Sequence, residues 1–169
     1  YVVDNRYPKI TKKDYFEMVS QKTAVLLETC CKTGAICAGA KEAEIKAIGD
    51  YGLNLGIAFQ IQDDILDIFG DEKVLGKKTG KDIIEKKMGN FVMLTAMEKL
   101  GPKEKKIICD LLESSKDITD EDIHVAAKLI LKTDAKETAE KTAKEYIQKA
   151  LKNLNKMPTN EYRETLNDI

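Results

Sequence analysis

The chain has 169 residues, which is enough for one domain with a substantial core and too few for two ordinary ones. Its formal net charge is −1, so it lacks the basic excess typical of proteins that bind nucleic acid or an anionic membrane surface. No apolar run reaches the roughly 20 residues of a membrane span. We therefore expect no nucleic-acid partner and no transmembrane segment.

The composition favours helices throughout. Three prolines, no tryptophan and many alanine, leucine, lysine and glutamate residues are typical of an all-α protein. We expect a bundle of mostly antiparallel helices that forms a single helical domain over residues 1–169. The four cysteines have neither zinc-site nor disulfide-scaffold spacing, which indicates a reducing, cytoplasmic setting. Cys30 and Cys37 would share one helix face, and we expect them to be small buried side chains.

The first helix is expected to begin near Thr11, which forms a capping-box pattern with Asp14. Apolar periodicity then predicts one continuous helix over residues 15–33. Lys22 and Thr23 lie within this helix. Taken alone, they fit an ordinary exposed lysine beside a β-branched residue.

The next predicted helix covers residues 41–69 and carries an acidic stripe. At about 100° per residue, Gln60, Asp63, Asp64 and Asp67 fall within an arc of roughly 100° on an otherwise mostly apolar segment. Three carboxylates on one narrow stripe repel one another unless a cation lies between them. Hard oxygen ligands of this kind suit Mg²⁺, which is usually shared with substrate phosphates. A solvated acidic face is the alternative.

This predicted helix contains three glycines, Gly49, Gly52 and Gly56. They lower its intrinsic helix propensity, so they need a compensating role in packing or binding. Because they lack side chains, we expect them to permit the close approach of a neighbouring helix or of a ligand.

A basic loop with the sequence GKKTGKD, residues 76–82, follows the acidic helix, and a solvated turn is the alternative interpretation. Apolar periodicity predicts a helix over residues 82–100, and Gly101-Pro102 interrupts the chain after it. Further helices are expected over residues 103–114, after the capping residue Thr119, over residues 134–154 and from about Asn160.

The sequence FQIQDDILD, residues 59–67, resembles the second aspartate-rich motif of the trans-type polyprenyl diphosphate synthases, the farnesyl and geranylgeranyl diphosphate synthase family. This motif is much more specific than the aspartates alone. Lys22-Thr23 and the loop at residues 76–82 also match the family, and the resemblance extends from about Thr11 to the end of the chain. It implies the carboxy-terminal half of the all-α isoprenoid synthase fold.

The resemblance implies a role for each matched residue. Asp63, Asp64 and Asp67 are expected to be catalytic and to bind Mg²⁺. A second set is expected to bind the substrate diphosphate: Lys22, Thr23, Gln60, Lys77 and Lys87. Lys86 is an alternative to Lys87, because Lys86, Gly89 and Phe91 stand where the family commonly has glycine, threonine and proline.

The activity implied is a Mg²⁺-dependent prenyl transfer, in which an allylic diphosphate condenses with isopentenyl diphosphate to give a longer polyprenyl diphosphate of the farnesyl or geranylgeranyl type. The chain has one of the family's two aspartate-rich motifs and lacks its isopentenyl diphosphate site. We therefore expect a carboxy-terminal fragment of a longer synthase, inactive alone and homodimeric at full length. A non-catalytic helical subunit of a synthase and a terpene-cyclase-like enzyme are the alternatives.

Overall fold

The structure is a computed structural model that describes residues 10–70, 79–85 and 89–169. Every regular element in these ranges is a helix, which confirms the all-α expectation. The chain divides into two compact units, so the single domain over residues 1–169 stays a prediction. Among the described helices, none is both long enough and apolar enough to cross a membrane.

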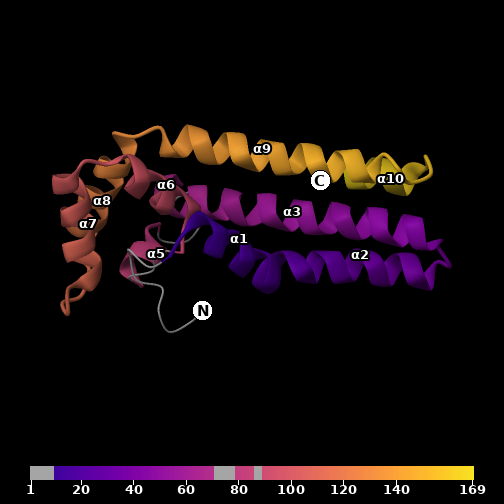
Figure 1. The fold of residues 1–169 in the computed structure, drawn as a ribbon, viewed down its shortest axis with the longest axis horizontal. Coiled ribbons are helices and arrows are strands. Elements are labelled where there is room, and N and C mark those ends of the chain that lie inside the picture. The colour runs from indigo at the N-terminus through magenta and orange to yellow at the C-terminus, as the bar shows by residue number, and fades with distance from the viewer. Residues whose placement is uncertain (1–9, 71–78, 86–88) are drawn as a thin grey trace. The chain divides into compact units, whose positions relative to one another are not determined.

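The first unit contains residues 10–15 and the described part of residues 61–141. Its core helix is α6, which is buried from Phe91 to Met97. A helix that is apolar around nearly its whole circumference is stable only inside a core, so the other helices of this unit cover it. The other helices of this unit are the end of α3 (Glu42–Phe69), α5 (Lys81–Ile84), α7 (Pro102–Glu113), α8 (Asp120–Leu131) and the start of α9 (Ala135–Leu154), which Figure 1 labels.

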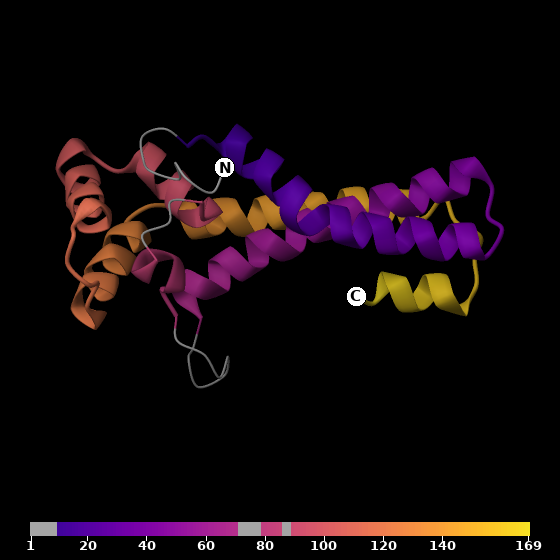
Figure 2. The same cartoon turned by 90° about the horizontal axis from the view of Figure 1, so that it is seen from below.

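The second unit contains residues 16–60 and 142–169. In it α2 (Val25–Cys37) and the first part of α3 lie side by side and antiparallel (Figures 1 and 2). The core forms where α3 meets the end of α9, around Tyr51 and Leu154. The Tyr51 hydroxyl donates a hydrogen bond of 2.7 Å to the backbone oxygen of Leu166, which fixes α10 (Glu161–Asn167) against α3.

The helix predicted over residues 15–33 is interrupted in the structure. It consists of α1 (Lys12–Val19), a π-helical segment η1 (Ser20–Ala24) and α2. The backbone N–H of Val25 donates to the oxygen of Ser20, five residues earlier, so the turn holds one residue more than an α-helical turn. Single π-turns of this kind occur often at functional sites, and this one contains Lys22 and Thr23.

The prediction of one helix over residues 82–100 is wrong. The structure has α5 and then α6, which begins only after Asn90. The Asn90 side chain accepts hydrogen bonds from the backbone N–H groups of Val92 and Met93, at 3.0 and 3.2 Å. Asparagine is a preferred N-cap and Gly89 is a poor helix former, so a new helix starts here.

The remaining predicted helices are confirmed with small shifts at their ends. The helix expected over residues 41–69 is α3, and those expected over 103–114 and 134–154 are α7 and α9. Thr119 caps α8 and Asn160 caps α10, because each side chain accepts a backbone N–H from the first turn. The capping box at Thr11 is also present, since its N–H donates to the Asp14 carboxylate at 2.8 Å.

The glycines of α3 permit close helix packing, as expected. A Cβ atom at Gly52 would lie 2.7 Å from the backbone oxygen of Leu27, and one at Gly56 would lie 2.6 Å from the Cα atom of Ala24. Both distances are far below ordinary van der Waals contact. The neighbour is therefore the segment η1–α2 of the same unit, whose backbone touches α3 at these two positions.

The burial predicted for Cys30 and Cys37 is wrong, because both side chains are exposed. The face of α2 that packs toward α3 instead carries Cys31 and Ala35, which lie against the core of the second unit. One residue along a helix turns the side chain by about 100°, so Cys30 points away from the contact that half-buries Cys31.

Alkylation of the thiols should follow this division. Burial, followed by the neighbouring Cys30, raises the pKa of the Cys31 thiol, so less of its reactive thiolate is present at pH 8. We expect iodoacetamide to modify Cys30 and Cys37 before Cys31, as read by peptide mass spectrometry over time. Equal rates in the folded protein would contradict the packing of α2, and equal rates in denaturant provide the control.

Candidate functional site

The three carboxylates of the acidic stripe lie near the end of α3, in the first unit. Asp63 is half-buried, whereas Asp64 and Asp67 are only 3% and 9% exposed. A solvated acidic face is therefore wrong for Asp64 and Asp67. Ionised carboxylates are retained at such depth only where donors or cations compensate for the lost hydration.

Backbone N–H groups supply part of that compensation at Asp67. Its two carboxylate oxygens accept hydrogen bonds from the N–H groups of Lys81 and Asp82, at 3.0 and 3.1 Å. Gly80, with a φ of 72°, makes the left-handed turn that brings these groups to the end of α3. Burial nevertheless raises the pKa of Asp67, the charge of Asp82 raises it further, and the two N–H groups oppose the shift.

Asp64 connects α3 to the start of α6. Its Oδ2 atom accepts a hydrogen bond of 2.7 Å from the N–H of Phe91, the first residue of α6. Its backbone oxygen accepts from Nδ2 of Asn90 at 3.2 Å. The N-terminus of a helix carries a partial positive charge, so α6 favours the ionised form of this carboxylate.

Two further side chains complete the cluster. Asp82 accepts a hydrogen bond of 3.1 Å from Nδ2 of Asn90. Tyr15 is fully buried, and its ring centroid lies 5.3 Å from that of Phe91. Burial raises the pKa of Tyr15, and the nearby charge of Asp64 raises it further. The phenol is therefore a neutral group beside clustered acids.

The predicted diphosphate-binding residues that the structure describes belong to the second unit. Lys22 is exposed within η1. The hydroxyl of Thr23 donates a hydrogen bond of 3.0 Å to Oε1 of Gln60, so these two predicted residues do meet. Lys77 and Lys87 lie outside the described residues, as does the alternative Lys86.

The chemistry of the carboxylates fits Mg²⁺ held together with a phosphate ligand. Among the described residues, no three His, Cys, Asp or Glu side chains are arranged to hold a metal ion. Mg²⁺ does not require such a cage, because it commonly takes one or two carboxylates and completes its shell with water and phosphate oxygens. An ionised carboxylate offers about four acceptor positions, and the N–H groups bound to Asp64 and Asp67 occupy only some of them.

Sequence reasoning assigned no role to Asp82, Asn90 or Tyr15. Asp82 ends the GKKTGKD loop, so its place after the acidic motif was a usable signal. Asn90 lies beside Gly89 and Phe91, where the sequence departs from the family pattern, and that departure marks the new helix cap. Tyr15 gave only the signal of an apolar position in α1.

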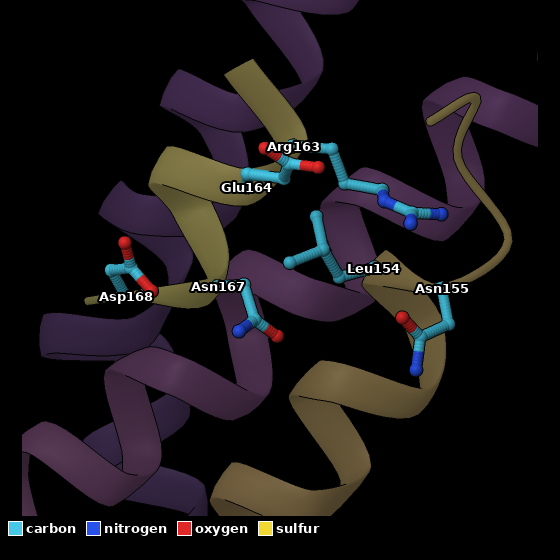
Figure 3. Close-up of a pocket in the computed structure, with 6 residues that line it drawn as sticks. All are labelled: Leu154, Asn155, Arg163, Glu164, Asn167 and Asp168. Carbon is cyan, nitrogen blue, oxygen red and sulfur yellow. The ribbon is translucent and has the colours of Figure 1, made fainter. Parts of the chain in front are cut away.

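A pocket of about 420 Å³ lies elsewhere, between the end of α9 and α10 in the second unit (Figure 3). Its lining is mostly polar and consists of Leu154, Asn155, Arg163, Glu164, Asn167 and Asp168. The Arg163 guanidinium donates to the backbone oxygen of Met157 at 3.1 Å, so it serves to hold the α9–α10 turn. None of the predicted site residues lines this pocket.

Known sequences resemble the chain over most of its length. The polyprenyl synthetase family model matches residues 2–130. A geranylgeranyl diphosphate synthase of Saccharolobus solfataricus is 40% identical over 149 residues, which cover 88% of this chain and 44% of that protein. A short chain isoprenyl diphosphate synthase of Methanothermobacter thermautotrophicus is 34% identical, covering 93% of this chain and 47% of that protein. The chain spans about half the length of the curated relatives it matches.

Solved structures agree with the sequence matches. A geranylgeranyl pyrophosphate synthetase from Pyrococcus horikoshii superposes with a TM-score of 0.81 and 38% identity, covering 94% of this chain and 47% of that one. A polyprenyl synthase from Roseobacter denitrificans superposes with a TM-score of 0.86 and 28% identity, covering 99% and 54%. These matches confirm the expected likeness to the isoprenoid synthase fold.

Proposed function

The chain belongs to the polyprenyl synthetase family, and we propose that it takes part in the Mg²⁺-dependent condensation of an allylic diphosphate with isopentenyl diphosphate. The observation that carries this proposal is the gathering of Asp63, Asp64, Asp67 and Asp82 at the end of α3. Several of the similar proteins are named geranylgeranyl diphosphate synthases, and we propose a product of the geranylgeranyl or farnesyl type. We further propose that the protein acts as a homodimer.

In this proposal Asp63, Asp64 and Asp67 would hold Mg²⁺, which when bound would supply positive charge to the leaving diphosphate. The exposed Lys22 supplies a compact positive charge for the diphosphate oxygens. The hydrogen bond between Thr23 and Gln60 orients these two polar side chains toward the same ligand. The allylic C–O bond breaks and diphosphate leaves. The double bond of isopentenyl diphosphate attacks the allylic carbon and a C–C bond forms. The resulting carbocation gives one proton to water and a new double bond remains. No nucleophilic side chain takes part.

A chimera tests the proposal. This chain would replace the matching residues of the Saccharolobus solfataricus relative, and products would be identified by mass spectrometry after incubation with both diphosphates and Mg²⁺. We expect a longer prenyl diphosphate from the chimera, none from the 169-residue chain alone, and at least about 100-fold less product after Asp63→Ala. Circular dichroism would confirm that both chimeras fold.

The same assay separates the alternatives. A cyclised hydrocarbon with diphosphate release would favour a terpene-cyclase-like enzyme. Full activity of a folded Asp63→Ala chimera would favour a non-catalytic role for this chain and would contradict the proposal.

A further inference from the structure

We infer that Asn90 is a positioning residue that holds Asp64 and Asp82 in place, an inference that rests on the proposed function for its catalytic meaning. Asn90 is fully buried, with no exposed surface. Buried amides are retained where their hydrogen bonds are satisfied, and every polar atom of this side chain has a partner.

The two ends of the amide serve different elements. Oδ1 accepts the N–H groups of Val92 and Met93 and so caps α6. Nδ2 donates to the backbone oxygen of Asp64 at 3.2 Å and to Oδ2 of Asp82 at 3.1 Å. Because Oδ1 must face two donors and Nδ2 two acceptors, only one orientation of the amide satisfies the network.

Both carboxylates therefore depend on this one side chain. Asp82 is held directly by Nδ2. Asp64 is held twice, by Nδ2 at its backbone and by the Phe91 N–H at its carboxylate, and the cap sets where that N–H points. A fully satisfied buried network of this kind specifies one arrangement of its members. Asn90 thus fixes two acids on separate elements relative to each other.

The variant Asn90→Asp separates positioning from capping. Aspartate has almost the same size and is an equally good N-cap, so α6 keeps its cap. In place of Nδ2, however, its second oxygen donates no hydrogen bond and repels the Asp82 carboxylate and the backbone oxygen of Asp64. Asn160→Asp is the matched control, because Asn160 is an exposed N-cap that accepts the N–H of Arg163 at 2.9 Å. With Mg²⁺ present, we expect Asn90→Asp to bind inorganic diphosphate about 10- to 100-fold more weakly, and Asn160→Asp to bind it as the unaltered chain does.

Amide hydrogen exchange without Mg²⁺ supplies a second readout. In Asn90→Asp we expect the N–H groups of Phe91 and Asp82 to exchange at least about tenfold faster, while those of Val92 and Met93 keep their protection. Unchanged exchange at Phe91 and Asp82 would overturn the inference, as would equal loss of protection at all four positions. Unweakened diphosphate binding by Asn90→Asp would also overturn it. If the unaltered chain binds no diphosphate, the proposed function fails, and the exchange data alone decide whether Asn90 positions the two acids.

Discussion

Replacing Asp67 with alanine is expected to lower the free energy of unfolding by about 2–4 kcal/mol, because two backbone N–H groups lose their charged acceptor. The carboxylate is almost buried and holds the first residues of α5, Lys81 and Asp82, to the end of α3. Chemical denaturation followed by circular dichroism would measure the change.

Asp63→Ala is expected to leave the stability of the protein nearly unchanged and to weaken diphosphate binding. Asp63 is half-buried, and its charge helps to raise the pKa of Asp67, so its removal relieves repulsion within the cluster. We expect the free energy of unfolding to change by less than about 0.5 kcal/mol while Mg²⁺-dependent diphosphate binding weakens about 10- to 100-fold. Equal effects of the two substitutions on the free energy of unfolding would contradict this division between Asp67 and Asp63.

Gly56→Ala is expected to destabilise the second unit by about 3 kcal/mol, at the upper end of what overpacking costs. The added methyl group would lie 2.6 Å from the Cα atom of Ala24, and backbone cannot move aside as a flexible side chain can. The clash also falls on η1, the segment that carries Lys22 and Thr23. We therefore expect Gly56→Ala to lower the midpoint of thermal unfolding and to weaken diphosphate binding.

Gly34→Ala is the matched control on the partner helix α2. Nothing lies within 4 Å of a Cβ atom at this position, so only helix propensity acts. We expect Gly34→Ala to stabilise the protein by about 0.5–1 kcal/mol. A loss of stability equal to that of Gly56→Ala would show that glycine is needed for a reason other than close packing.

The acidic stripe was predictable because its geometry is local. Asp63, Asp64 and Asp67 are separated by one and three residues, and helical periodicity alone places them on one face. The capping boxes at Thr11 and Thr119 were predictable for the same reason, since each is a contact between residues three positions apart.

The interruptions of the predicted helices could not be predicted from the sequence, because they depend on contacts between residues far apart in the chain. The π-turn at Ser20–Ala24 changes the helix register by one residue, and it coincides with the contact between Ala24 and Gly56. The break before α6 depends on Asn90, whose partner Asp64 lies 26 residues away. The exposure of Cys30 depends on which face of α2 meets α3. Periodicity records none of these long-range contacts.

One measurement tests the central claim most directly, namely calorimetric titration of inorganic diphosphate into the chain with and without Mg²⁺. Asp50→Ala provides a control on the same helix, because Asp50 is an acid that pairs with Lys46 at 2.9 Å, outside the stripe. We predict binding that requires Mg²⁺, that survives Asp50→Ala and that weakens strongly in Asp63→Ala. Absence of binding, binding indifferent to Mg²⁺, or an equal effect of both substitutions would contradict the claim that α3 presents a metal-dependent diphosphate site.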